Sequence, residues 1–284
     1  MVAVVVAFGL GWWLASRSRP VAHPTGERPP VLRRTVVSPS PLAQRTPPER
    51  PVRTPPAPPR PTATPAFRVA IVFDDAGGSL SDVEEIIAIG RPVAVAVLPG
   101  LVHSADVARR ARAAGLEVLL HLPVEPEDET KELGPGGVTV SMTDAEIRAT
   151  VRSGLASVPG AIAVNNHMGS KGTADPRVVR AILEVVRKEG LFFLDSVTTP
   201  RTVVGRVAAE LGVRTAARTV FLDNENEEEA IRGQVRRLIA LAKNRGSAVA
   251  IGHAQRLTRG VVAAMLHEFD QEGVTLVPLS TLVR

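Results

Sequence analysis

From Phe67 to the C-terminus the sequence alternates short apolar runs with amphipathic segments, and this rhythm constrains the fold more than any other feature. The runs are rich in valine, isoleucine, leucine and alanine with little polar alternation, as expected for parallel strands covered on both faces. They span residues 68–73, 93–98, 117–120, 161–164, 191–194, 219–222, 248–251 and 274–277. Eight strands with intervening helices predict a single barrel-like α/β domain over residues 67–284, with an open doubly wound sheet as the alternative.

Capping residues between the apolar runs mark where helices begin and end. Thr143 to Glu146 has the spacing of a capping box. Asp175-Pro176 and Thr199-Pro200 each place a proline directly after an N-cap residue. Glycines stand where helices should stop, two or three residues before a strand. They are Gly115, Gly190, Gly246 and Gly273.

Residues 1–16 are predicted to be a signal anchor or signal peptide. The segment from Met1 to Ala15 is almost wholly apolar and contains the pair Trp12 and Trp13. It is short for a membrane span, which needs about 20 residues, but it suits a signal-peptide core or a tilted anchor. Arginines follow this segment and none precedes it. An earlier start, with a basic stretch ahead of Met1, would satisfy the positive-inside rule.

Residues 17–66 are predicted to be a disordered linker. Most of the 24 prolines of the chain fall here, with serine, threonine and arginine and almost no large apolar side chains. The first 66 residues hold nine arginines and two acids, a net charge of +7, so residues 67–284 carry −2 of the total of +5. The basic character therefore belongs to the linker, and we do not expect a nucleic-acid partner.

Polar side chains stand at the ends of most predicted strands. Because the carboxyl ends of parallel strands open on one face of a barrel, these side chains should converge on one mouth. In chain order they are Asp74, Asp75, His121, Asn165, Asn166, His167, Asp195, Asp223, Asn224 and His253.

Adjacent carboxylates such as Asp74 and Asp75 repel each other at the end of a buried strand, and a divalent cation would relieve the repulsion. Asp75, His121 and His167 would then form a three-ligand site with an open position, as in catalytic centres, while Asp74 serves as the base. The chain has no cysteine, which excludes a thiolate site. Histidine and aspartate ligands suit zinc, with manganese, cobalt or nickel as alternatives.

The motifs that carry these residues resemble those of the divergent polysaccharide deacetylases, a distant branch of the NodB-type carbohydrate esterases. The matching segments are IVFDDAGG (71–78), VAVAVLPG (93–100), GLEVLLHLPVEP (115–126), VNNHMGSKGT (164–173), LFFLDS (191–196), FLDN (221–224) and IGHA (251–254). The resemblance implies a NodB-like deformed (β/α) barrel acting in the bacterial cell envelope, in a periplasmic or extracytoplasmic location. It also implies that Asp74 is the catalytic base, Asp75 a metal ligand, and His253 a catalytic histidine supported by Asp195.

Two departures from the NodB pattern concern the site. The second histidine of the family's metal motif is replaced by Glu125, so either His167 or Glu125 must complete the ligand set, and we favour His167. The family's motif arginine is absent near Asn165 and Asn166. These two asparagines, Glu125 and Asp223 are further candidate site residues.

The expected function is metal-dependent removal of acyl groups, chiefly acetyl, from an envelope carbohydrate polymer. The alternatives are a catalytically silent glycan-binding or regulatory module on the same barrel, and a metal-dependent amidase acting on peptides. Aromatic residues make up only 3% of the chain and tyrosine is absent, so no aromatic stacking surface for sugars is visible in the sequence.

Overall fold

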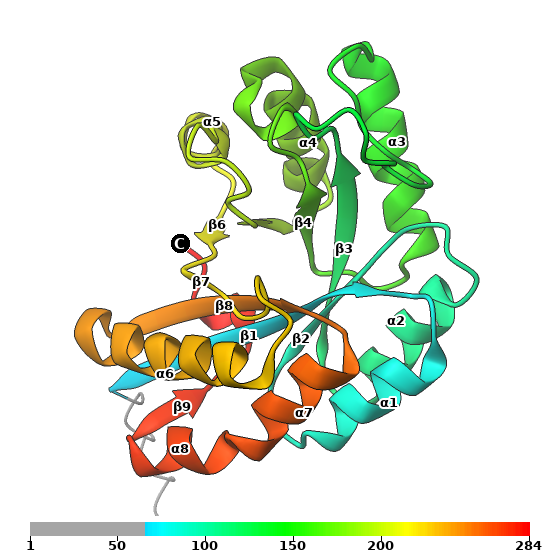
Figure 1. Ribbon diagram of the computed structural model, residues 1–284. Coiled ribbons are helices and arrows are strands. Elements are labelled where there is room, and N and C mark those ends of the chain that lie inside the picture. Colours follow the sequence, from blue (N-terminus) through cyan, green and yellow to red (C-terminus); the bar gives the residue numbers. More distant parts are fainter. Residues whose placement is uncertain (1–65) are drawn as a thin grey trace, which may run out of the picture. The chain divides into compact units, whose positions relative to one another are not determined.

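The computed structural model describes residues 66–284 (Figure 1). The predicted signal segment and all but the last residue of the predicted linker lie outside this range. Within it, no helix is both long enough and apolar enough to cross a membrane.

The sheet is entirely parallel, and it curls into the predicted deformed (β/α) barrel (Figure 1). Its strands are β1 (Phe67–Ala76), β2 (Ala94–Val97), β3 (Glu117–Val124), β4 (Ala163–Met168), β5 (Phe192–Asp195), β6 (Thr215–Ala217), β7 (Val220–Phe221), β8 (Ser247–His253) and β9 (Val274–Leu276). Their order is β6-β5-β4-β3-β2-β1-β8-β7, and β9 pairs with the first three residues of β1. The NodB-like fold class predicted from the sequence is confirmed.

Helices cover the outside of the sheet (Figure 1). They are α1 (Leu80–Ala88), α2 (Ser104–Ala113), α3 (Asp144–Ser157), α4 (Pro176–Lys188), α5 (Val204–Leu211), α6 (Glu228–Arg245), α7 (Arg256–Ala264) and α8 (Leu266–Gln271), with 3-10 turns η1 (Gly172–Ala174) and η2 (Leu279–Thr281). The capping box at Thr143 and the N-cap at Asp175 are confirmed. The helix start expected at Thr199-Pro200 is wrong, because α5 begins at Val204. The Val204 N–H donates to the hydroxyl of Thr202.

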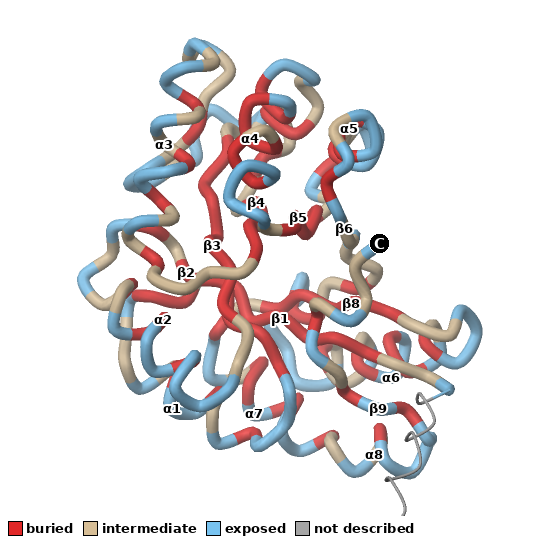
Figure 2. Tube along the Cα trace, turned by 180° about the vertical axis from the view of Figure 1, so that it is seen from behind, coloured by how far each residue is buried: buried red, intermediate tan, exposed pale blue. Residues whose placement is uncertain are grey.

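Strand alternation assigns each strand residue to one of two apolar layers. In β1, Val69, Ile71 and Phe73 pack outward against the helices, whereas Ala70 and Val72 belong to a second cluster that fills the barrel. Figure 2 shows that the strands are buried along most of their length. The barrel cluster also contains residues of β2, β3, β4, β5 and β8, among them Ala96, Leu119, Ala163, Leu194 and Ile251.

One short segment, Thr215 to Phe221, links the two edges of the sheet. Its first half is β6, paired with β5, and its second half is β7, paired with β8. Arg218 and Thr219 form the break between them. The missed strand β6 has the sequence Thr-Ala-Ala, which contains no run of large apolar residues to reveal it.

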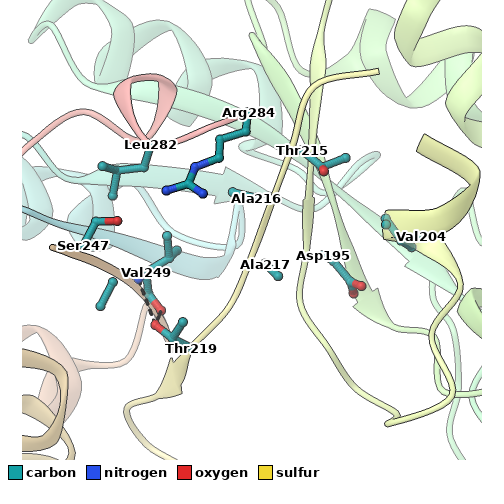
Figure 3. A pocket seen from close by; sticks show the side chains of 12 residues that line it. Asp195, Val204, Thr215, Ala216, Ala217, Thr219, Ser247, Val249, Leu282 and Arg284 are labelled. Atoms are coloured by element: carbon teal, nitrogen blue, oxygen red, sulfur yellow. Dashed lines mark hydrogen bonds between the residues drawn. The ribbon is translucent and has the colours of Figure 1, made fainter. Parts of the chain in front are cut away.

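Two cavities flank this crossing segment. One, of about 440 Å³, lies between the segment, the first residues of β8 and the start of α5, and Figure 3 shows the side chains around it. The other, of about 460 Å³, lies at the carboxyl ends of the strands. We call this second cavity the mouth. The polar strand-end residues singled out in the sequence lie in or beside the mouth, except Asp195, which lines the first cavity.

Candidate metal centre and active site

The phase of each strand decides which polar residues point into the mouth. Residues two positions beyond a barrel-filling residue share its direction. This rule places four polar residues at the ends of the inner rows of β1, β3, β4 and β8, namely Asp74, His121, Asn165 and His253. Three of them line the mouth, and the fourth, Asn165, donates a hydrogen bond to Asp74. The sequence expectation that strand ends bring these residues together is met for all four.

A β-bulge turns Asp75 toward the same site as its neighbour Asp74. The pairing of β1 with β2 moves from Phe73–Val95 to Ala76–Val97, so β1 contains one extra residue there. Asp75 adopts a left-handed backbone conformation with φ of 61°, which is uncommon for a residue other than glycine. Without this bulge, strand alternation would direct the two carboxylates to opposite faces of the sheet.

Asp75, His121 and His167 bring three ligand atoms together, as the sequence predicted. Asp75 Oδ1 lies 3.1 Å from His121 Nε2 and 2.9 Å from His167 Nδ1, and the two imidazole nitrogens are 3.2 Å apart. Ligand atoms held at about 2.0–2.1 Å around one tetrahedral zinc ion would be roughly 3.3 Å apart. Asp75 Oδ1 is buried and makes no hydrogen bond. The donor set and this unpaired oxygen fit a divalent ion.

Asn165 connects the predicted ligand His121 to the predicted base Asp74. Its side-chain N–H donates to Asp74 Oδ1 at 3.0 Å, which leaves its carbonyl oxygen to accept from His121 Nδ1, also at 3.0 Å. The neutral form of His121 would therefore carry its proton on Nδ1, which leaves the Nε2 lone pair available to bind an ion. Such outer hydrogen bonds fix the orientation and tautomer of a metal-ligating histidine.

The two adjacent carboxylates have opposite pKa shifts. Burial raises the pKa of Asp74 to about 6, and the Asp75 carboxylate adds to this shift while His121 and Asn165 oppose it. Burial also acts to raise the pKa of Asp75, but the imidazoles of His121 and His167 outweigh it and hold that pKa well below its usual range. An ionised ligand thus stands beside a carboxylate with higher proton affinity, a pairing suited to acid–base catalysis.

His253 is oriented by Asp223 and not by Asp195, which corrects the expected pairing. Its Nδ1 lies 3.2 Å from Asp223 Oδ1, and its backbone N–H donates to Asp223 Oδ2. The buried hydroxyl of Thr258 donates to the same oxygen at 2.6 Å. The Asp223 carboxylate raises the pKa of His253, so the imidazole holds a proton more tightly than usual. Thr258 was missed as a site residue, because its contact to Asp223 joins segments 35 residues apart.

Asp195 points away from the mouth because of its place in β5. Leu194 belongs to the barrel cluster, so strand alternation directs Asp195 outward, where it lines the other cavity near Val204 (Figure 3). Its carboxylate accepts from the Val197 N–H at 2.8 Å and from the Thr202 hydroxyl at 2.8 Å. Asp195 therefore shapes the turn after β5 and does not contact His253.

The remaining candidates, Glu125 and Asn166, also have partners outside the ligand cluster. Glu125 accepts from the Lys171 amine and from the Val140 N–H, both at 2.6 Å, so it anchors the long loop after β3. Asn166 accepts from the Ser196 N–H and thereby ties the end of β4 to the end of β5. The choice of His167 over Glu125 as third ligand agrees with this geometry.

Arg218, which the sequence reasoning did not single out, lines the mouth from the crossing segment. Its guanidinium donates to the carbonyls of Ser196 and Val197 at 2.6 and 2.7 Å. Its Cζ lies 5.1 Å from the centre of the Phe221 ring. Because it is not within any motif of the resemblance, only the three-dimensional path of the segment reveals it.

Comparison with known proteins agrees with this geometry. Residues 71–283 match the profile of the divergent polysaccharide deacetylase family. An uncharacterized protein of Haemophilus influenzae is 35% identical over 217 residues, which cover 76% of this chain and 77% of that protein. The uncharacterized protein YibQ of Escherichia coli is 37% identical over 218 residues, which cover 77% of this chain and 68% of that protein.

A crystal structure of an uncharacterized protein from Agrobacterium tumefaciens has the same fold. It aligns with a TM-score of 0.73 at 22% identity, covering 78% of this chain and 91% of that one. The family profile spans most of the chain, and it includes every candidate ligand and acid–base residue described above. The protein belongs to the divergent polysaccharide deacetylase family.

Proposed function

We propose that the protein is a metal-dependent hydrolase that removes acyl groups, chiefly acetyl, from an envelope polysaccharide. The observation that supports this most strongly is the cluster of Asp75, His121 and His167, which offers three ligand atoms beside a buried carboxylate. The two imidazoles and one carboxylate favour zinc as the ion. A divalent ion held there would activate water and polarise the acyl carbonyl.

In the proposed reaction, the chain's own residues move two protons. Asp74 has one oxygen engaged by Asn165, so its Oδ2, 3.5 Å from His121 Nε2, is the atom that would take a proton from the attacking water. His253 lies on the neighbouring strand β8, in register with Asp74, with its Nε2 3.7 Å from Asp75 Oδ2. Because Asp223 favours its protonated form, His253 would donate a proton to the departing amine or alcohol.

Metal content tests the ligand assignment. The full chain, reconstituted with zinc and dialysed, should hold one equivalent by elemental analysis. We expect His121→Ala to lose the ion, since three protein ligands become two, and the matched variant Glu125→Gln to retain it. Stoichiometric zinc in His121→Ala, or loss of zinc in Glu125→Gln alone, would contradict the assignment.

Acetate release from acetylated glycans tests the catalytic role. The zinc-loaded chain should release acetate, and Asp74→Asn should keep the ion but lose about 10²- to 10⁴-fold in rate, the usual contribution of a general base. If the wild-type chain binds zinc and glycan but releases no more acetate than Asp74→Asn across a broad substrate panel, the protein is a glycan-binding module and the proposed hydrolysis is wrong.

We further propose that the protein acts in the bacterial envelope, outside the cytoplasm and tethered by its N-terminal segment. The support is the apolar character of residues 1–16 and the proline-rich composition of residues 17–66. Cell fractionation of the native chain checks this, and recovery of the intact protein in the cytosolic fraction would exclude it.

A further inference from the structure

Arg218 is held rigidly at the break of the crossing segment. Its backbone N–H donates to the Asp195 carbonyl at 2.9 Å, and its side chain reaches across to the turn after β5. That turn is itself unusual, because Val197 adopts a left-handed conformation with φ of 48°, which is strained for a β-branched residue. The Val197 N–H donates to the Asp195 carboxylate, and the Val197 carbonyl accepts from the Arg218 guanidinium. Both polar backbone groups of the strained residue are therefore held in place.

The hydrogen bonds of Arg218 occupy one edge of its planar guanidinium. Nε donates to the Ser196 carbonyl and Nη2 to the Val197 carbonyl, and these two nitrogens form the side edge of the group. The end edge consists of Nη1 and the second proton of Nη2. Within residues 66–284, Nη1 makes no hydrogen bond. An end edge with two parallel N–H groups matches the two oxygens of a carboxylate.

Arg218 forms no close ion pair in the described part of the chain, although Asp195 and Asp74 lie near enough to act on its charge. The buried Arg259 shows the usual arrangement, because its guanidinium lies 3.1 Å from Asp82 and 2.8 Å from Glu85. Arg218 is half-buried against the Phe221 ring, yet no carboxylate of residues 66–284 comes within 4 Å of it. Charges withdrawn from water are normally paired. A half-buried cation in the wall of the mouth therefore points to an anion supplied from outside the protein.

We propose that Arg218 binds a carboxylate of the substrate, so that the polymer acted on carries acidic sugar residues. This proposal rests on the proposed function, because it assumes that the acylated sugar enters the same mouth. Among the residues lining the mouth, Arg218 is the only arginine or lysine. It shares this wall with Phe221 and His253, whose rings contact each other edge to face at 5.1 Å. The acyl group would lie toward the ligand cluster, and the acidic substituent toward the crossing segment.

Binding of matched sugars to the zinc-loaded full chain tests the proposal without requiring turnover. The probes are N-acetylmuramic acid, its neutral methyl ester, an N-acetylated uronic acid and N-acetylglucosamine. For the wild-type chain we expect at least one of the two acids to bind about tenfold or more tightly than its neutral counterpart, as for a charge-assisted hydrogen-bonded pair. The acid that binds shows where on the sugar the carboxylate lies.

Variants separate recognition from a purely structural role. Arg218→Gln should abolish the preference for the acid while leaving the affinity for the neutral ester unchanged, and Arg218→Lys should retain part of the preference. The control Arg214→Gln removes an exposed arginine directly before the crossing segment, which lies over the Phe192 ring, and should change nothing. The zinc content of each variant, measured alongside, shows whether the centre remains intact.

Three results would overturn the proposal. They are equal affinity of wild type for acid and ester, no binding of either acid at millimolar concentration, and equal weakening of both ligands by Arg218→Gln. A preference for the acid without acetate release would support the Arg218 subsite and refute the proposed hydrolysis. Acetate release from neutral and acidic glycans at equal rates would do the reverse.

Discussion

The turns after β5 and β7 each hold a buried aspartate, but the two carboxylates have opposite pKa shifts. At the β5 turn, burial raises the pKa of Asp195, and the Val197 N–H and Thr202 hydroxyl offset only part of it. At the β7 turn, burial acts in the same direction on Asp223, but His253 and Thr258 outweigh it and lower the pKa. Asp195 accepts hydrogen bonds from neutral donors, with the Arg218 guanidinium acting on it only at longer range, whereas Asp223 faces an imidazole directly.

This difference shows that a position at a strand end does not by itself define a catalytic role. Both oxygens of Asp195 accept hydrogen bonds that stabilise a strained turn. In Asp223, Oδ2 accepts from the Thr258 hydroxyl and the His253 backbone N–H, and Oδ1 lies 3.2 Å from His253 Nδ1. The first arrangement fixes the shape of the wall, and the second fixes the tautomer and charge of His253, the proposed proton donor.

The largest expected contrast between the two turns is in activity. Asp223→Asn should lower kcat/KM for acetate release by roughly 10³-fold or more, because an amide can stabilise the wrong tautomer of His253 and not its protonated form. Asp195→Asn should stay within about tenfold of wild type, since the asparagine oxygen can still accept from the Val197 N–H while its amide donates to the Thr202 hydroxyl. Steady-state kinetics of the zinc-loaded variants measure both. Equal losses would mean that Asp195 supports the histidine after all.

A second contrast concerns stability at neutral pH. Asp223→Asn should lower the free energy of unfolding by about 1–3 kcal/mol, because it removes a buried charged acceptor from three donors. Asp195→Asn should be neutral or stabilising, because it removes a buried charge whose pKa is already raised. Urea unfolding of the full chain at pH 7 measures these differences, with a chelator present throughout so that metal binding does not contribute.

The pH dependence of these two differences should have opposite signs. The folded pKa of Asp223 is depressed, so its stabilisation is present above the unfolded value of 3.8 and is lost as the pH falls through the folded pKa. The folded pKa of Asp195 is raised, so its destabilisation is absent below 3.8 and grows as the pH rises toward the folded pKa. Matching profiles for the two asparagine variants would contradict the opposite shifts.

The sequence predicted the barrel and the ligand cluster, but it could not separate Asp195 from Asp223. Apolar runs and strand ends were sufficient to bring Asp75, His121 and His167 together. The run Leu191 to Leu194 is apolar at every position, as in a strand buried on both faces, so it does not show which residues point inward. Without that phase, an aspartate at its end could be assigned to either face.

The position of Arg218 and the bulge at Asp75 could not be predicted from the sequence, for a different reason. Both depend on how one strand is aligned with its neighbours, and neither the β1–β2 register nor the crossing path of Thr215 to Phe221 has a local sequence signal. The motif arginine expected near Asn165 is absent from the sequence. The structure shows a cation entering the mouth from another element instead.

A matched pair of threonine variants sharpens the comparison further. Thr258→Val removes a hydroxyl from an ionised carboxylate and should cost about 1–2 kcal/mol of unfolding free energy, because hydrogen bonds to charged groups are the stronger ones. Thr202→Val removes a hydroxyl from a carboxylate whose charge is disfavoured and should cost about 0.5–1 kcal/mol. Only Thr258→Val should also raise the pKa of His253 further, because the Asp223 carboxylate loses a donor that disperses its charge, and an NMR titration of the imidazole would show it.

The smallest predicted effect tests the strain at the β5 turn. Val197→Gly should raise the unfolding free energy by about 0.5–1 kcal/mol, because relief of a left-handed valine exceeds the entropic cost of glycine. The equivalent position after Asp223 is Glu225, whose φ is not positive, so Glu225→Gly should lower the unfolding free energy by about the same amount. Chemical denaturation of the pair measures both signs. If Val197→Gly were destabilising like Glu225→Gly, the turn after β5 would not be strained, and the bonds from Asp195 and Arg218 would only position a relaxed loop.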